Sequence, residues 1–225
     1  MGFYPFFKKG IKKRCYWCLE EDSTKLSKDH LPPDRIFPEH DREGLQLITA
    51  TICDNCKQLH GRLGEDDSDF VCHMLLWQFL SSQNPLLKEK LESCLKHSRL
   101  ARGRDIIDIE ILTIHPSSGG TAQYPILRGG REVILRVLDN IARGIYYRMR
   151  GEIIPTLVMP ETEFQPIDSF KALGNPLAIQ SPCVVKKEVF AWKPILYEDG
   201  EVRFLCWEFK FYSLQPLPIY YSYTL

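Results

Sequence analysis

Four cysteines in the N-terminal part of the chain form two Cys-x-x-Cys pairs, Cys15/Cys18 and Cys53/Cys56. Each such pair bends the chain so that two thiolates face one point, and four thiolates satisfy the tetrahedral coordination of Zn²⁺. A site of this kind has no open position, so it predicts a structural zinc that contributes on the order of 10 kcal/mol to folding. A redox role is disfavoured because the first pair lacks a strand–CxxC–helix context.

The loop between the two pairs contains Asp29 and His30, which are followed after one residue by two prolines. A carboxylate is a hard oxygen ligand for a divalent metal ion, and a neutral imidazole can take a proton from water near pH 7. Hydrolysis of a phosphodiester needs both functions, because a cation must take up the charge that develops on the phosphate while a base activates water. A zinc ribbon without catalysis is the simpler interpretation, but it leaves the Asp-His pair unexplained.

Residues 15–60 resemble the HNH endonuclease superfamily, in which a β-hairpin bearing Asp-His and a following helix form a ββα-metal module. They are most similar to the bacterial subgroup with a Cys-x-x-Cys, a DHxxP motif, a leucine-rich turn and a second Cys-x-x-Cys. The resemblance implies that His30 is the general base and that Asp29 binds a catalytic Mg²⁺ or Mn²⁺. It also implies that the last ligand of this ion is His60, on the helix after the second pair.

Two positions depart from the pattern of this subgroup. The asparagine that orients the base aligns with Gln46, which carries the same amide on a side chain one methylene longer. The residue directly after the second pair is commonly asparagine and here is Lys57. These departures favour an alternative, a catalytically inactive zinc-containing module that binds nucleic acid or protein. His40 and Asp54 are close enough in the sequence to replace the missing groups.

Residues 1–14 are basic, although the whole chain has a formal net charge of +0. Four aromatic residues lie within 3–7, the cations follow them, and no acid is present; the cations are Lys8, Lys9, Lys12, Lys13 and Arg14. Cations and aromatic rings together suit the phosphates and bases of a nucleic acid, so these five residues and Lys57 are the predicted nucleic-acid contacts. The alternative is a frayed leader that only aids solubility. Contacts to the backbone do not read sequence, so weakly sequence-specific cleavage is expected.

The function predicted from these residues is a metal-dependent endonuclease that hydrolyses phosphodiester bonds of DNA, with RNA left open as a substrate. The family context adds bacterial defence against foreign DNA as the expected role. A second copy of the chain or another protein is the expected partner of the C-terminal body. No run of about twenty apolar residues is present and no secretory signal begins the chain, so no membrane span and a cytoplasmic location are expected.

The composition, 44% hydrophobic and 26% charged, is ordinary for a globular protein. Eight cysteines in a cytoplasmic chain favour metal ligation over disulfides. The cysteines outside the two pairs stand alone among apolar or helix-forming residues and are predicted to be small buried hydrophobes. They are Cys72, Cys94, Cys183 and Cys206.

The sequence pattern of the elements that must position these residues predicts an α+β chain. Residues 1–67 are expected to form a small zinc-stabilised HNH-like module, and residues 68–225 an accessory body of helices and antiparallel strands. Helical periodicity predicts helices over 66–80, 85–99 and, most strongly, 131–148, which has charges on one face and apolar residues on the other: Ile134, Val137, Leu138, Ile141 and Ile145. Alternation predicts strands over 106–114, 184–192 and 201–213, the last two joined by a turn at 198–200.

Overall fold

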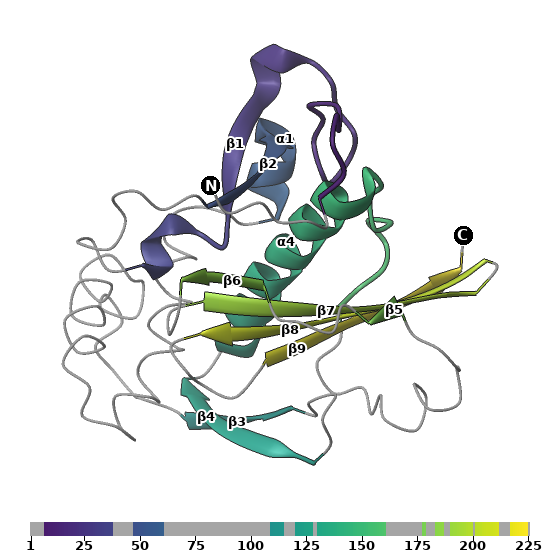
Figure 1. Cartoon of the computed structure of the whole chain (residues 1–225). Coiled ribbons are helices and arrows are strands. Elements are labelled where there is room, and N and C mark those ends of the chain that lie inside the picture. The colour runs from purple at the N-terminus through teal and green to yellow at the C-terminus, as the bar shows by residue number, and fades with distance from the viewer. Residues whose placement is uncertain are drawn as a thin grey trace. The chain divides into compact units, whose positions relative to one another are not determined.

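The structure of the chain is a computed structural model (Figure 1), and it describes residues 7–37, 47–60, 109–114, 120–127, 130–160, 177–178, 183–186, 190–199, 201–211 and 217–224. These residues form an α+β arrangement with antiparallel sheets, which confirms the predicted class at this level. The chain divides into two compact units, Met1–Glu110 with Ile126–Thr156 and Ile111–Pro125 with Leu157–Leu225. The predicted boundary at residue 67 lies outside the described residues and stays a prediction.

The first unit contains a β-hairpin followed directly by a short helix. Strand β1 (Leu26–Leu31) pairs antiparallel with strand β2 (Ile48–Cys53), with Asp29 opposite Ala50 and His30 opposite Thr49. Helix α1 (Asp54–Leu59) begins at the end of β2, where the Cys53 side chain accepts a hydrogen bond from a backbone N–H of the first turn. The described order is therefore strand, strand, helix, and the second cysteine pair lies at the junction of β2 and α1.

Two features of the sequence explain the hairpin. Strand β1 ends at Leu31 because the next two residues are prolines, which cannot donate a ladder hydrogen bond. Alternation places the apolar residues Ile48, Ala50 and Ile52 of β2 on one face, and all three are buried. Helix α4 (Gly130–Arg150) packs against this hairpin, as Figure 1 shows for β1, β2 and the green helix.

Helix α4 confirms the strongest helix prediction, and the five predicted core residues of its apolar face are all buried. The opposite face is not simply a solvent-facing surface, because Asn140 and Arg143 are only 0% and 1% exposed. The helix ends at Gly151, whose φ of 77° is left-handed and whose N–H donates to the Tyr147 carbonyl at 2.8 Å.

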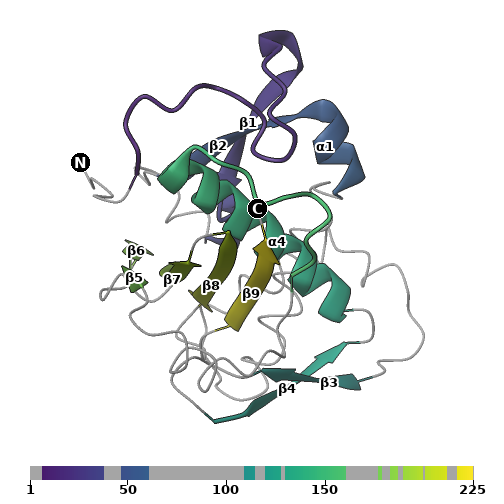
Figure 2. The same cartoon turned by 90° about the vertical axis from the view of Figure 1, so that its right-hand side faces the viewer.

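Besides two single-turn 3-10 helices, η1 (Ser23–Lys25) and η2 (Asp34–Ile36), the remaining described regular structure consists of antiparallel strands. Strands β3 (Ile109–Ile114) and β4 (Ala122–Leu127) make a two-stranded sheet, which confirms the predicted strand at 106–114 over its described part. The second unit contains a five-stranded sheet of order β5-β7-β8-β9, in which β6 also pairs with β7 (Figure 2). Its strands are β5 (Leu177–Ala178), β6 (Cys183–Lys186), β7 (Phe190–Asp199), β8 (Val202–Phe211) and β9 (Leu217–Thr224).

The second strand of the predicted C-terminal hairpin is confirmed as β8, which pairs with β7 so that Asp199 is opposite Val202. The first strand was predicted over 184–192, but the structure divides these residues between β6 and the start of β7. Pro194 lies within β7, between the residues that pair with β6 (190–192) and those that pair with β5 (195–196). No ladder hydrogen bond from its backbone nitrogen is needed on that side of the strand. Cys206 of β8 is 0% exposed, as predicted for a small buried hydrophobe. Cys72, Cys94 and the predicted helices at 66–80 and 85–99 lie outside the described residues. None of the described helices combines the length and apolar character needed to cross a membrane.

Candidate metal centre

The two cysteine pairs come together in the structure. The sulfur atoms of Cys15, Cys18, Cys53 and Cys56 all lie within 4.8 Å of one another, and the Cys18 and Cys53 sulfurs are 3.7 Å apart. Four sulfurs at about 2.3 Å from a central Zn²⁺ in a tetrahedron are about 3.8 Å from each other. The spacing therefore fits this coordination, and the four cysteines could hold a structural metal ion such as zinc.

The electrostatics of the cluster favour a cation at its centre. Cys18 is exposed, whereas the other three cysteines are buried. Burial raises the pKa of Cys18, and together with the neighbouring sulfurs it raises that of Cys56 strongly. Burial also opposes ionisation of Cys53, but hydrogen bonds from the Cys56 backbone and from the other thiols outweigh it and lower the pKa of Cys53. A bound metal ion deprotonates its thiol ligands outright, which removes the cost of keeping these thiols together.

Backbone hydrogen bonds fix the first cysteine pair independently of the thiols. Cys15 forms a parallel bridge with Thr51 at β2, and the Tyr16 N–H donates to the Thr51 carbonyl at 2.9 Å. The turn is closed by hydrogen bonds from Cys15 N to Glu20 O and from Leu19 N to Cys15 O, both 2.9 Å long. The sulfurs of the first pair are therefore held at the strand that leads into the second pair.

Asp29 and His30 are neighbours on β1, so their side chains point to opposite faces of the hairpin. Asp29 is half-buried, and its Oδ2 accepts a hydrogen bond of 2.6 Å from the Tyr16 hydroxyl. His30 is exposed and stands opposite Thr49. The two predicted catalytic side chains thus have different surroundings, one tethered from inside the unit and the other facing solvent.

His60 lies at the C-terminal end of α1, where its ring stacks on the Trp17 indole. The ring centroids are 3.5 Å apart and the planes differ by 6°. Burial and then the charge of Arg143 lower the pKa of His60, which favours the neutral form of the stacked ring. Within the described part of the chain, the four cysteines are the one group of three or more potential ligands that could share an ion. Asp29, His30 and His60 do not assemble a second one, and the catalytic Mg²⁺ or Mn²⁺ stays a prediction.

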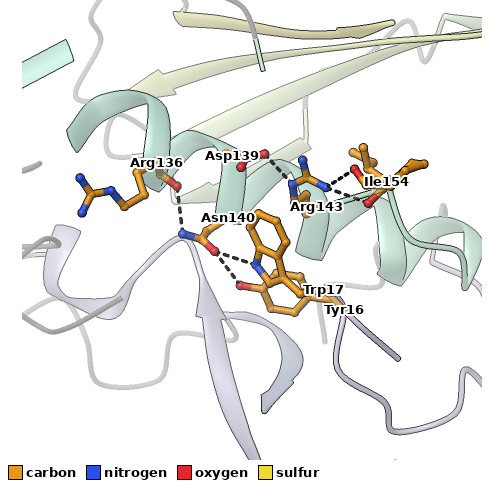
Figure 3. Close-up of polar contacts among 8 residues, drawn as sticks. Tyr16, Trp17, Arg136, Asp139, Asn140, Arg143 and Ile154 are labelled. Carbon is orange, nitrogen blue, oxygen red and sulfur yellow. Dashed lines mark hydrogen bonds and ion pairs between the residues drawn. The ribbon is translucent and has the colours of Figure 1, made fainter. Parts of the chain in front are cut away.

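A buried polar network connects the first cysteine pair to helix α4 (Figure 3). The Asn140 Oδ1 accepts a hydrogen bond of 3.0 Å from the Trp17 indole N–H, and it lies 3.4 Å from the Tyr16 hydroxyl. Its Nδ2 donates to the Arg136 carbonyl at 2.9 Å, so both ends of the amide are used. The Tyr16 hydroxyl also donates to Asp29, so this hydroxyl links the Asn140 amide of α4 to the hairpin.

Arg143 is the second buried polar residue of this network. Its Nε donates to Asp139 Oδ1 at 2.7 Å, and one Nη donates to the Ile154 carbonyl at 2.7 Å. The guanidinium carbon lies 4.2 Å from the centroid of the Trp17 ring. An imidazole and a guanidinium cannot both lie so close over one face, so the indole is sandwiched between His60 and Arg143. No signal in the sequence marked these two residues, because charged side chains recur along the whole of this helical stretch.

The predicted nucleic-acid contacts differ in their surroundings. Lys8 donates from its Nζ to the Arg150 carbonyl at 3.3 Å, and Arg14 forms an ion pair with Glu21. The remaining predicted cations, Lys9, Lys12, Lys13 and Lys57, are exposed. Residues 7–14 are held on α4 rather than frayed, through hydrogen bonds from Lys8 N to Arg148 O (3.1 Å) and from the Tyr147 hydroxyl to Lys12 O (2.9 Å). Gln46 and His40 lie outside the described residues.

Comparisons with family models, with curated proteins and with solved structures find no match to this chain. The resemblance of residues 15–60 to the HNH superfamily therefore stays a prediction from the sequence. The class that the structure itself defines is an α+β protein with a four-cysteine cluster that could bind zinc.

Proposed function

We propose that this protein is a metal-dependent endonuclease that hydrolyses phosphodiester bonds of DNA, with RNA as a second possible substrate class. The observation that carries the proposal is the solvent-facing His30 beside the tethered carboxylate of Asp29, on a hairpin that runs into a helix at a four-cysteine cluster. Strand, strand and helix in this order, with an Asp-His pair on the first strand, are what the resemblance to the HNH superfamily predicts.

The roles of the two residues follow from their surroundings. His30 is exposed, so its imidazole can take a proton from a water molecule at a bound strand. The Asp29 Oδ2 accepts a hydrogen bond from Tyr16, which orients the carboxylate that would bind the metal ion. Mg²⁺ keeps several waters and is commonly bound by one or two carboxylates together with substrate phosphates, so a single carboxylate can suffice. The ion would supply the positive charge that stabilises the phosphate during hydrolysis.

The second candidate is a zinc-containing module that binds nucleic acid without cleaving it. Two observations favour it: Asp29 and His30 point to opposite faces of β1, and His60 is stacked on Trp17. In this candidate the cysteine cluster and α4 serve only to hold the surface that binds the strand.

Cleavage of plasmid DNA in the presence of Mg²⁺ or Mn²⁺ separates the two candidates. The zinc-loaded wild-type chain is compared with His30→Ala and with the control Lys210→Gln, which changes an exposed lysine of β8 in the second unit. Loss of a general base lowers the rate by about 10²- to 10⁴-fold. The nuclease proposal expects this loss in His30→Ala alone, at unchanged zinc content. If wild type and His30→Ala both bind DNA and neither cuts it, the chain is a binding module.

A further inference from the structure

A cavity of about 350 Å³ lies within the first unit and is lined by three parts of the chain. The N-terminal segment contributes Lys12 and Lys13, the hairpin contributes Lys28 and the C-terminal end of α4 contributes Arg148. Hydroxyl side chains of Ser, Thr and Tyr residues complete much of the lining. A volume near the lower limit for ligand sites suits one small polar group rather than a large apolar ligand.

The charge of this cavity is positive and uncompensated. None of the described residues that line it is an aspartate or a glutamate. Lys12, Lys13 and Lys28 are exposed, and within the described ranges no carboxylate forms an ion pair with them. Arg148 is half-buried and lies 5.5 Å from the centroid of the Phe7 ring, an aromatic partner that leaves its charge in place. Four cations around so small a volume favour a ligand with negatively charged oxygens.

The cations are held in place by backbone contacts. The N-terminal segment is attached to α4 by the hydrogen bonds from Lys8 N to Arg148 O and from the Tyr147 hydroxyl to Lys12 O. These contacts also occupy the negative end of the helix, because the carbonyls of Tyr147, Arg148 and Arg150 accept from Gly151 N, Lys8 N and Lys8 Nζ. Three of the last four carbonyls of the helix therefore already accept hydrogen bonds, which reduces the repulsion that this end of the helix exerts on an anion.

We propose that this cavity binds a backbone phosphate of a nucleic-acid strand. Thr49, which lines the cavity, stands directly opposite His30 in the hairpin register. Lys28 precedes His30 by two residues and so lies on the same face of β1, about 7 Å away along the strand. This distance matches the spacing between successive phosphates of an extended strand, so a phosphate held at Lys28 places its neighbour at His30. The link to His30 rests on the proposed function, whereas phosphate binding itself does not.

Binding of labelled DNA tests the inference separately from cleavage. Fluorescence anisotropy is measured with single- and double-stranded oligonucleotides and the zinc-loaded full chain, without added Mg²⁺ or Mn²⁺. Lys28→Gln should weaken binding about tenfold, as expected for one charged hydrogen bond, irrespective of base sequence. The slope of log K against log salt should fall by about one. The matched control is Lys210→Gln, an exposed lysine on β8 of the second unit, which should bind like wild type.

The outcomes distinguish this inference from the proposed function. If Lys28→Gln and the double variant Lys12→Gln/Lys13→Gln both keep wild-type affinity and salt slope, the cavity is not a strand-binding site, even if His30-dependent cleavage is found. If binding depends on Lys28 but no cleavage is found, only the proposal of a nuclease is refuted. Inorganic phosphate or a mononucleotide that displaces the oligonucleotide at equal concentration assigns the cavity to a small phosphate ligand and overturns the strand assignment.

Discussion

Gly144 of α4 lies directly against Leu31, the last residue of the strand that carries Asp29 and His30. A Cβ atom at Gly144 would overlap the Leu31 Cδ1, and it would lie 3.1 Å from Cδ2 and 3.3 Å from Cγ. Leu31 is 0% exposed, so its side chain has no solvent to move into. We therefore predict that Gly144→Ala lowers the free energy of unfolding of the first unit, although alanine is the better helix former.

The magnitude follows from two opposing effects. Replacement of a helical glycine by alanine contributes about 1 kcal/mol of stabilisation through helix propensity. Overpacking of a buried site costs about 1–3 kcal/mol, and overlap with one atom of a fully buried side chain, with tight contacts to two more, places this case near 3 kcal/mol. Gly144→Ala should therefore be destabilising by about 2 kcal/mol net. Leu31→Ala alone should cost about 2–5 kcal/mol through the cavity it leaves.

The double variant gives the decisive comparison. In the Leu31→Ala background the overlapping atoms are gone, so Gly144→Ala should now stabilise by about 1 kcal/mol. The coupling of about 3 kcal/mol far exceeds the roughly 0.5 kcal/mol expected for independent sites. Hydrogen exchange of the β1 and α4 amides measures these free energies for the first unit alone. Equal destabilisation by Gly144→Ala in both backgrounds would refute the packing described here.

Three further predictions concern the metal centre and its supports. Elemental analysis should find one zinc per chain in wild type and in Cys206→Ala, whereas Cys18→Ser should lose the ion to a chelator; zinc retained by Cys18→Ser would exclude the four-sulfur site. Asn140→Ala should lower the free energy of unfolding by about 2–3 kcal/mol in urea titration, because it leaves the buried indole N–H of Trp17 without an acceptor; a neutral effect would argue against this hydrogen bond. Tyr16→Phe should retain zinc but slow plasmid cleavage about tenfold, since it removes the donor to the Asp29 carboxylate; an unchanged rate would mean that the hydroxyl does not orient this group.

Local patterns in the sequence were sufficient for several parts of the structure. The two-residue spacing within each cysteine pair allowed the four-sulfur cluster to be predicted, because ligand spacing is a local property. The helix at 131–148 and strand β8 followed from apolar periodicity of 3.6 and 2 residues. Strand β9 was not predicted, and Pro218 lies inside it; the proline is tolerated because, in the described part of the chain, β9 pairs with β8 alone.

Contacts between distant segments could not be read from the sequence. Periodicity cannot show that Asn140 is buried, because the aromatic residues that bond its Oδ1 belong to a segment more than a hundred residues earlier. The stacking of His60 on Trp17 is equally non-local, and a histidine after a cysteine pair is by its position a plausible metal ligand. Lys28 and Arg148 were not among the predicted contacts, since neither belongs to a basic cluster in the sequence and only the fold brings them to one cavity.

The first unit is assembled from two stretches of chain separated by a long interval, and this has a consequence for biosynthesis. While the ribosome has released only the hairpin, Ile48 and Ile52 lack the helix that buries them, and the Trp17 indole lacks its acceptor. The unit can close only after translation has passed residue 150, so the nascent chain presents an apolar, thiol-bearing surface during that delay. An expression fragment meant to retain the metal centre must therefore include Ile126–Thr156.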